Sequence, residues 1–520
     1  MYSAILGGLF YNRVGPKWTA LIGAILIGVG FGGMHECGKE DATCSENGVG
    51  FLNFIAQHGS GWIASCTMAT SVRNFPSQDR GVVVGIAKGA FAISTGFIAQ
   101  IYIGMYKPNA LKFLKFLAIF APCVIVICIP FLRLISADEK RSSEKSSSSS
   151  SCGLIVTSVL ILFNGAWLLF VAMLQQMSES KNIKLFSLYT CVSFFSMILC
   201  VVPCVRCFRS KNRQGQRAIE LTKNSILKVI RRRTSQKYER VSLASQVEDE
   251  EEKEGETDDD LEMTVRKVKH KIRSLSRSSV ESAKTSSIVV DDKSLCQVLV
   301  SQDFYILAVA FLVGSGSGLM FINNVTQIAQ SKTYALADTE YLRIKNTLIV
   351  LFGASNLYGR VVIGAVSDRL GGKQNRALLL AVCIACMGIS HFIMSMMEES
   401  DIDSLYPCTL LVGLFFGCVF SLCASLVADL FGTKYFAGNY GAADIAPSLG
   451  SLLFSTLLAG KVYDTYALPD GESGNSTCYG SDCFKLSFVV MGLMCLFGGV
   501  PFTLYLQERI KNAATRTNTT

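Results

Sequence analysis

Long apolar runs recur along almost the whole of this 520-residue chain. A hydrocarbon core of about 30 Å is crossed by roughly 20 apolar residues in a helix, because a helix satisfies its own backbone hydrogen bonds there. We count thirteen runs, near residues 1–11, 17–35, 49–71, 81–104, 111–134, 153–175, 186–207, 303–327, 342–366, 376–397, 405–429, 438–461 and 484–507. The pattern predicts an all-α, polytopic membrane protein.

The first run is shorter than a membrane span. Residues 1–11 would cover about 16 Å as a helix, roughly half of the apolar core. The run also lacks the basic start and small-residue cleavage site of a secretory signal. We therefore interpret Met1 as lying inside a helix, and we expect a first helix to be missing from the sequence as given.

The charged residues, with a net charge of +9, lie largely between the apolar runs. When the connecting segments are assigned alternately to the two sides of a bilayer, Lys and Arg gather in one set: 12–17, 72–80, 132–151, 367–376, 430–437 and 507–520. By the positive-inside rule this set is cytoplasmic. We expect the basic charge to orient the chain in the lipid bilayer, and we expect no nucleic-acid partner.

The opposite set of loops has the features of a non-cytoplasmic face. It is acidic, and it contains the glycosylation triplet that begins at Asn475. It also contains two cysteine pairs, Cys37 with Cys44 and Cys478 with Cys483. In an oxidising compartment such pairs favour one disulfide in each loop, with unpaired thiols as the alternative.

Two polar segments interrupt the apolar runs. Residues 136–151 form a serine-rich linker. Residues 208–300 combine a basic start, an acidic run at 248–260 and a basic return, which together predict a disordered cytoplasmic loop. Ser276 and the Thr234-Ser235 pair follow arginines, as sites of basophilic kinases do; regulation by a kinase and a chance match both remain open.

These segments divide the chain into domains. We expect an N-terminal transmembrane half at 1–135, an inserted two-helix hairpin at 152–207, a C-terminal transmembrane half at 301–508 and a cytoplasmic tail at 509–520. Restoring one helix before Met1 gives six helices, the hairpin and six more. Two six-helix halves around a long cytoplasmic loop resemble the layout of major facilitator transporters.

Two loop motifs carry this resemblance. GGLFYNRVGPK resembles the Gly-rich basic loop between the second and third helices of the superfamily, and GAVSDRLGGKQNR resembles its repeat between the eighth and ninth. The resemblance implies gating loops whose charges form a latch between the halves. Its residues would be Arg13 and Lys17 in the first copy, where Asn12 replaces the usual acid, and Asp368, Arg369, Lys373 and Arg376 in the second.

Longer stretches resemble the nodulin-like branch of the superfamily, which occurs in plants and protists. They are RNFPSQDRGVVVGIAKG, LVGSGSGLMFINNVTQIAQS, SNLYGRVVIGAVSDRLGG, ADLFGTKYFAGNYG, SLLFSTLLAGKVYD and CYGSDCF. The two-helix insertion is typical of the same branch. This resemblance implies a major facilitator fold of two six-helix halves plus a two-helix insertion, and a transport function whose substrate it does not specify.

Polar residues within the apolar runs are candidates for a substrate site, because burying them in hydrocarbon is costly. Lys88 lies about two turns into its helix and could either bind substrate or extend to the cytoplasmic surface. Asn323 and Gln327 are four residues apart, with Asn324 adjacent, so they share a helix face. They could bind a polar substrate or hydrogen-bond a neighbouring helix.

Three more candidates lie in the runs at 342–366 and 438–461. Asn356 and Arg360 are four residues apart, and arginine offers a planar fork suited to a carboxylate. The spacing resembles the Asp-x-x-x-Arg pair of monocarboxylate porters, with Asn in place of Asp, and this implies an anionic substrate at Arg360. Asp444 is the candidate for a coupled proton, because burial favours the protonated carboxyl; a structural pair with a cation is the alternative.

The expected function is secondary active or facilitative transport of a small polar or anionic solute by alternating access, with or without H+. The sequence has no phosphate loop, no metal-spaced His/Cys cluster and no nucleophile elbow, so we expect no enzyme activity, cofactor or metal. The alternative is a membrane receptor that uses the 208–300 loop as its output. Either protein would be multi-pass, in the plasma membrane or an endomembrane.

Overall fold

The computed structural model describes residues 4–39, 44–135, 148–177, 182–193, 196, 292–333, 338–398, 401–469 and 476–519. These residues belong to one compact unit, formed by 1–202 and 290–520. Asn475, Thr234, Ser235, Ser276 and most of the two polar segments lie outside the described residues. The predictions of a glycan and of kinase sites therefore stay predictions.

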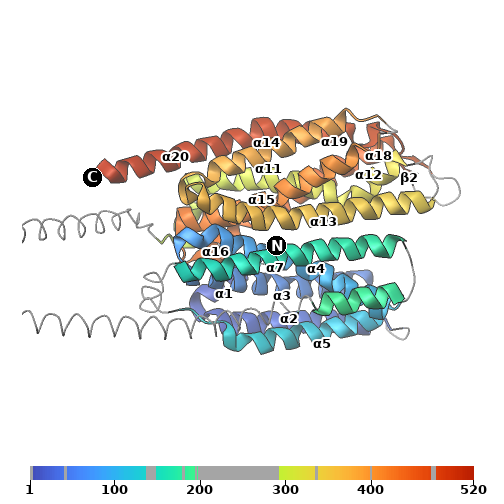
Figure 1. The fold of residues 1–520 in the computed structure, drawn as a ribbon, viewed down its shortest axis with the longest axis horizontal. Coiled ribbons are helices and arrows are strands. Elements are labelled where there is room, and N and C mark those ends of the chain that lie inside the picture. Colours follow the sequence, from blue (N-terminus) through green and yellow to red (C-terminus); the bar gives the residue numbers. More distant parts are fainter. Residues whose placement is uncertain are drawn as a thin grey trace, which may run out of the picture. The chain divides into compact units, whose positions relative to one another are not determined.

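The N-terminal part of the chain folds into a set of helices (Figure 1). They are α1 (Ala4–Val14), α2 (Pro16–Cys37), α3 (Glu46–Asn74), α4 (Arg80–Ile101), α5 (Ala110–Cys128) and α7 (Ser148–Met177), with single turns η1 (Ser77–Asp79), η2 (Tyr102–Tyr106) and η3 (Ile129–Phe131) and a further helical stretch at 182–193. The local sequence explains why several of these helices start where they do. Pro16 occupies the first turn of α2, and the side chains of Ser45 and Asn109 accept hydrogen bonds from Gly48 N and Lys112 N at the starts of α3 and α5.

The C-terminal part forms a second set of helices. They are α10 (Leu295–Leu299), α11 (Gln302–Asn323), α12 (Val325–Lys332), α13 (Asp338–Arg369), η5 (Gly372–Gln374), α14 (Arg376–Ser395), α15 (Leu405–Phe431), α16 (Phe436–Ala443), α17 (Ile445–Gly450), η6 (Ser451–Gly460), α18 (Lys461–Tyr466), α19 (Asp482–Leu493), η8 (Met494–Gly499) and α20 (Val500–Thr519). Two short strands, β1 (Leu468–Pro469) and β2 (Ser476–Thr477), pair antiparallel between α18 and α19.

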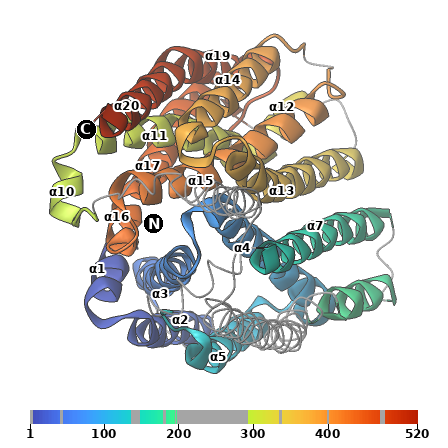
Figure 2. The same ribbon diagram turned by 60° about the vertical axis from the view of Figure 1, so that its left-hand side comes forward.

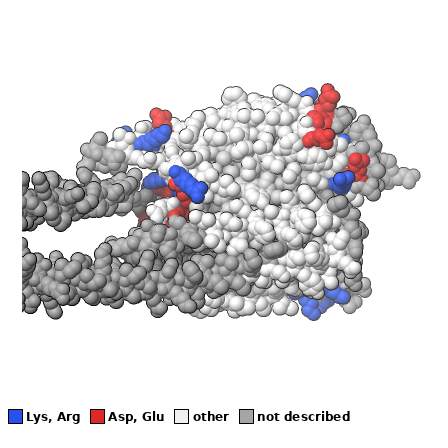
Figure 3. All heavy atoms as spheres, viewed as in Figure 1, with Lys and Arg blue, Asp and Glu red and all other residues white. Residues whose placement is uncertain are grey.

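The helices have the length and surface of membrane-spanning segments. Within the described residues, ten helical segments are long and apolar enough to cross a bilayer. On the face drawn in Figure 3, Lys, Arg, Asp and Glu gather at the two ends of the helices, and the broad middle carries none. Charge at the ends and an uncharged belt between them are what a bilayer requires. The prediction of a polytopic α-helical membrane protein is confirmed.

The two helical sets meet along two lines of contact. α1 packs against α16, and α4 packs against α13 (Figure 2). At the second line the backbones approach closely, because a Cβ atom on Gly85 of α4 would lie only 2.6 Å from the Arg360 carbonyl oxygen of α13. Such contact requires glycine. α7, from the predicted insertion, contacts both α4 and α13 and therefore touches both halves.

Three polar segments end elsewhere than predicted. α7 begins at Ser148, inside the predicted 136–151 linker, because serine is tolerated in a helix that continues into an apolar run. Residues 292–300, inside the predicted 208–300 loop, are structured and include α10. α20 continues to Thr519 through the predicted 509–520 tail, whose composition contains no Gly or Pro to end a helix.

The turn between α15 and α16 holds the end of the long polar segment. Oδ1 of Asp292 accepts hydrogen bonds from the backbone N–H groups of Thr433 (2.9 Å) and Lys434 (3.0 Å). The N–H of Lys293 donates to the Phe431 carbonyl at 3.0 Å. Gly432 has φ +80°, a conformation that favours glycine, and its backbone lies against Asp292. These contacts hold residues 292 and 293, which the sequence pattern placed in a disordered loop, against the turn between α15 and α16.

Two of the predicted runs are interrupted by a polar residue. The run at 303–327 breaks at Asn324, between α11 and α12, and the run at 438–461 breaks at Asp444, between α16 and α17. The Asn324 amide donates a 2.8 Å hydrogen bond to the Met320 carbonyl, which the backbone would otherwise satisfy. Short polar side chains compete with the helical backbone in this way.

Both predicted cysteine pairs are bonded in the structure. The Cα atoms of Cys37 and Cys44 are 5.3 Å apart, and those of Cys478 and Cys483 are 5.8 Å apart, distances that suit disulfide bonds. Cys37 is the last residue of α2, and Cys483 lies in the first turn of α19. The last turn of α2 and the first turn of α19 lie at the same end of the helices. Both disulfides are therefore at that end, hereafter the disulfide end.

Candidate substrate site and interdomain latch

A short chain of hydrogen bonds crosses between the halves deep in the protein. Nζ of Lys88, on α4, donates to the Tyr440 hydroxyl of α16 at 2.6 Å. The Tyr440 hydroxyl donates in turn to Oδ1 of Asp444 at 3.1 Å. Lys88 therefore does not extend to a membrane surface. It is linked through Tyr440 to Asp444, the one acid of the 438–461 run.

Arg360, on α13, lies beside this chain and is 7% exposed. Its Nε donates to Oδ1 of Asn356 at 2.9 Å, and one Nη donates to the Lys88 carbonyl at 3.3 Å. Both cations face the same aromatic ring: the distances to the centre of the Phe420 ring are 5.6 Å from Lys88 Nζ and 5.2 Å from Arg360 Cζ. Cation–π contact stabilises charge where water is excluded.

The charges of this cluster do not balance. Asp444 is the carboxylate that acts electrostatically on both Lys88 and Arg360. Within the described residues, neither cation forms a salt bridge with any carboxylate. Buried charges are normally paired, because desolvation is costly. Two cations that share one indirect carboxylate leave an excess positive charge that an anion would neutralise.

The other predicted polar residues lie at the break between α11 and α12. Asn323 donates to the Ser451 hydroxyl at 3.0 Å, and Asn324 donates to the Ser455 hydroxyl at 3.1 Å, both across to η6. Oε1 of Gln327 is buried without a hydrogen-bond partner among the described residues. Among the described residues, no hydrogen bond joins these three side chains to Lys88 or Arg360. In the structure, Asn323 and Asn324 therefore form hydrogen bonds with a neighbouring helical segment, η6, which is the second of the two roles predicted for them.

A second charge cluster joins the halves at the end opposite the disulfides, hereafter the latch. The Asp429 carboxylate, at the end of α15, accepts hydrogen bonds from Arg80 at the start of α4 and from Arg376 at the start of α14. Arg376 also donates to the Asp368 carboxylate at the end of α13. Asp429 is 2% exposed and Arg376 is 1% exposed. Water is therefore excluded from these ion pairs.

Asp368 also binds the start of α4 directly. Its two carboxylate oxygens accept hydrogen bonds from the backbone N–H groups of Gly81, at 2.9 Å, and Val82, at 2.8 Å. The first N–H groups of a helix have no partner within the helix, and the helix dipole favours a negative charge there. An acid of the C-terminal half thus caps a helix of the N-terminal half.

The remaining predicted gating residues lie outside this network. Arg369 is exposed, and Lys373 is half-buried; burial lowers the pKa of Lys373, and Asp429 offsets part of this shift. Arg13 and Lys17 are exposed and form no salt bridge with a described residue. The first copy of the loop instead uses the amide of Asn12, which donates to the Tyr435 carbonyl at 3.5 Å.

Sequence reasoning missed four residues of these clusters. Arg80 and Asp429 lie at the ends of apolar runs, where a charge usually faces water, so neither was identified as a site residue. Phe420 and Tyr440 are aromatic residues in apolar runs, which most often pack in a core. A signal was nevertheless present for Asp429: it is the one carboxylate of its run of 27 residues.

The helical architecture and its paired clusters define a membrane transporter of two halves. Comparison with known proteins agrees. A family described as Nodulin-like matches residues 3–205, and one described as NFD4, C-terminal domain, matches residues 288–515. The chain belongs to the nodulin-like family of the major facilitator superfamily.

Three relatives illustrate the similarity. Protein NUCLEAR FUSION DEFECTIVE 4 of Arabidopsis thaliana is 26% identical over 43% of this chain and 38% of its own length. The probable transporter MCH1 of Saccharomyces cerevisiae is 27% identical over 38% of this chain and 40% of its own length. The MFS-type transporter YhjX of Escherichia coli is 29% identical over 33% of this chain and 40% of its own length. The matched region thus spans well under half of each relative.

Proposed function

We propose that this chain transports a small organic anion by alternating access and binds it between Lys88 and Arg360. The observation that carries this proposal is the pair of cations itself. They come from opposite halves, they face the same Phe420 ring, and neither has a direct carboxylate partner among the described residues. An anion bound there would contact both halves, which is the requirement for a substrate that controls their relative movement.

The hydrogen bonds around Asp444 support coupling to a proton. While Asp444 is ionised, its negative charge neutralises part of the positive charge of Lys88 and Arg360. Protonation of Asp444 removes that charge, so the two cations would attract an external anion more strongly. Tyr440, which lies between Lys88 and Asp444, would transmit the change through its hydroxyl. A proton and an anion would then bind together and cross together, as symport requires.

The latch gives the alternating movement a physical basis. In the present conformation Arg80, Asp368 and Asp429 close one end of the seam between α4 and α13. Opening that end would break these buried contacts, and binding of substrate to Lys88 and Arg360 would offset the cost. By the charge of its loops, the latch end is the cytoplasmic one. We place the protein in the plasma membrane or an endomembrane, with the long polar loop in the cytoplasm.

Uptake into proteoliposomes tests the proposed substrate class. Purified protein would be supplied with labelled mono- and dicarboxylates, and with an amino acid and a sugar for comparison. We expect uptake of a carboxylate, and we expect Lys88→Ala or Arg360→Ala to reduce its apparent affinity by about 30-fold or more, because each removes a buried charge partner.

Lys112→Ala is the matched control, since Lys112 is exposed and lies away from the cluster. Its uptake should equal that of the unaltered protein. Folded protein that transports only the neutral solutes, or in which Lys88→Ala and Lys112→Ala behave alike, would refute the proposal.

A further inference from the structure

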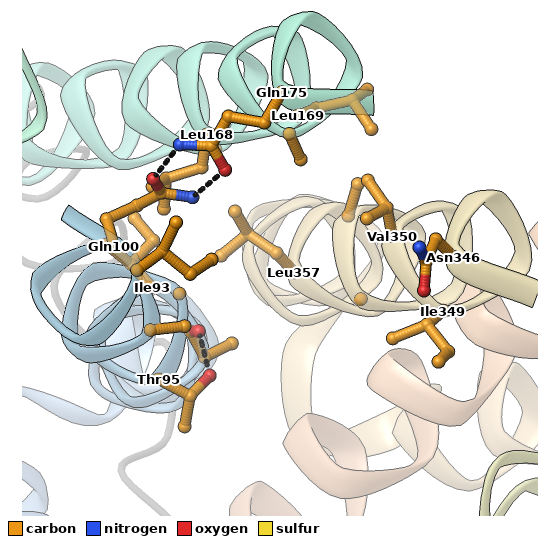
Figure 4. Close-up of a pocket in the computed structure, with 18 of the residues that line it drawn as sticks. Ile93, Thr95, Gln100, Leu168, Leu169, Gln175, Asn346, Ile349, Val350 and Leu357 are labelled. Carbon is orange, nitrogen blue, oxygen red and sulfur yellow. Dashed lines mark hydrogen bonds between the residues drawn. The ribbon is translucent and has the colours of Figure 1, made fainter. Parts of the chain in front are cut away.

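A cavity of about 800 Å³ lies between α4, α7 and α13, toward the disulfide end (Figure 4). Small-molecule sites commonly have volumes of roughly 300 to 1,000 Å³. The figure shows Ile93 and Thr95 on α4, Leu168 on α7 and Asn346 on α13 around the space. Two of its walls belong to opposite halves, and the third is α7 of the insertion.

α7 is fixed to both halves at the edges of this cavity. Across to α4, the Gln175 amide donates to Oε1 of Gln100 at 2.7 Å, and the Gln100 amide donates back at 3.4 Å. Across to α13, the Tyr358 hydroxyl donates to the Leu162 carbonyl at 3.1 Å. The amides of Gln100 and Gln175 thus satisfy each other's hydrogen bonds. These contacts hold α7 in place as one wall of the cavity.

The lining combines an apolar body with positive charge. Most of the surface is aliphatic, from side chains such as Leu169 and Ile349. Lys107, Lys184 and Arg343 contribute the charged groups, and no Asp or Glu is among the described residues that line the space. Those three cations also form no salt bridge with a described carboxylate. The cavity is therefore electropositive without an internal counter-ion.

The three cations lie at one end of the cavity. α4 and α13 run antiparallel, because the start of α4 meets the end of α13 at the latch. Lys107 follows the end of α4, and Arg343 lies near the start of α13, so both are at the disulfide end. Lys184 follows the end of α7, whose Gln175 contacts Gln100 near the end of α4, so it lies at the same end. A ligand would place its charge there and its apolar part farther in, against Leu357.

This cavity is separate from the Lys88–Arg360 site. The lining comes closest to that site at Ala92 and Leu357, but it includes neither Lys88 nor Arg360. Lys107 and Arg343 lie at least 17 residues from Lys88 and Arg360 along the chain, which is about 25 Å along a helix. The cations of the two sites are different residues on different turns. A ligand in the cavity and a substrate at Lys88 and Arg360 would therefore occupy different positions on the same seam.

We propose that the cavity between α4, α7 and α13 is a second binding site, which takes an amphipathic anion: a molecule with one anionic group and an apolar body. The anionic group binds Lys107, Lys184 and Arg343, and the body contacts the aliphatic side chains of all three helices. Two sources have this chemistry, a fatty-acid-like lipid from the bilayer and an aryl or alkyl carboxylate from water. Either would connect α7 to both halves.

Photolabelling tests the site without any measurement of transport. The full chain in phosphatidylcholine nanodiscs would be irradiated with one of two probes, a diazirine analogue of palmitic acid or 4-azidobenzoate, and the labelled residues would be identified by mass spectrometry. We expect saturable labelling within 92–107, 165–184 or 342–357. Labelling by the long-chain probe alone would indicate a lipid ligand, and labelling by 4-azidobenzoate alone would indicate a water-borne one.

Two kinds of variant connect the label to the cavity. The triple variant Lys107→Gln, Lys184→Gln, Arg343→Gln should reduce labelling about tenfold, since three partly exposed ion pairs together contribute about that factor. The triple variant Lys112→Gln, Lys115→Gln, Lys485→Gln removes three exposed lysines elsewhere and should leave labelling unchanged.

A filling variant gives an independent check. A Cβ atom on Gly353 meets no atom within 4 Å, so Gly353→Leu would project into the cavity without disturbing the packing. It should abolish labelling, whereas Gly50→Leu, at another helical glycine with open space around it, should not. Absence of saturable labelling by both probes, or equal labelling of the two triple variants in folded protein, would overturn the proposal.

Discussion

The Lys88 ammonium and the Tyr440 hydroxyl are joined by a 2.6 Å hydrogen bond although 352 positions separate them in the sequence. Lys88 belongs to α4 of the N-terminal half, and Tyr440 belongs to α16 of the C-terminal half. Any rotation of one half against the other must lengthen or break this bond. The buried cation and the conformation of the protein are therefore linked, and substitutions around them have predictable consequences.

Asp444→Asn should separate anion movement from proton movement. The amide cannot be ionised, so it can neither carry a proton nor respond to pH. We expect accumulation of the anion driven by a pH gradient to be lost, while exchange of internal for external anion continues. Uptake with an imposed pH gradient, compared with counterflow, measures both. Asp303→Asn, which affects a partly exposed ion pair with Arg509 at 2.5 Å, should keep both activities; equal behaviour of the two variants would contradict the role given to Asp444.

Asp429→Asn should open the latch. It leaves the buried side chain of Arg376 and the neighbouring Arg80 without the charge that both contact, and loss of one partner of a buried pair costs about 3–5 kcal/mol. A cysteine placed by Ser367→Cys, at a site that is fully buried, reports the change through its rate of modification by a water-soluble maleimide. We expect a rate increase of more than tenfold. Asp464→Asn, at an exposed acid of the disulfide end, should give no increase.

Gly85→Ala should prevent the halves from closing at the α4–α13 contact. The added Cβ would lie 2.6 Å from the Arg360 carbonyl oxygen, which is backbone and cannot move aside. We expect transport to be lost while the protein remains folded, with the same Ser367→Cys reporter modified rapidly. Gly50→Ala adds the same methyl group where no atom lies within 4 Å. Normal transport by Gly85→Ala would show that the contact does not have to form during the cycle.

Asn475→Gln should remove a glycan when the protein is produced in eukaryotic cells. The triplet lies in the loop of the Cys478–Cys483 disulfide, which the positive-inside rule places on the non-cytoplasmic side. Asn518→Gln is the control, because the triplet Asn518-Thr519-Thr520 lies in the C-terminal tail, which the positive-inside rule places on the cytoplasmic side. Sensitivity to a glycosidase measures both. A glycan at Asn518 and none at Asn475 would reverse the proposed orientation.

The sequence predicted the site residues unevenly. Arg360, Asn356, Asp444 and Lys88 were recognisable one by one as polar groups within apolar runs, and the structure brings these four together. Asn323 and Asn324 satisfied the same criterion, yet they bond to η6. Position within an apolar run shows that a polar group needs a partner, but it does not show whether the partner is a substrate or another helix.

The sequence by itself indicated most of the helices that are long and apolar enough to cross a membrane, because each such helix has to satisfy its own backbone hydrogen bonds and keep charge out of hydrocarbon. It also determined which loops carry the basic charge and where cysteines are close enough to pair. Only the tertiary structure decided that Arg80 meets Asp429, that Asp368 caps α4 and that α7 closes a cavity on the seam. These contacts join residues hundreds of positions apart, and their energies depend on the distance between helices, which no local pattern specifies.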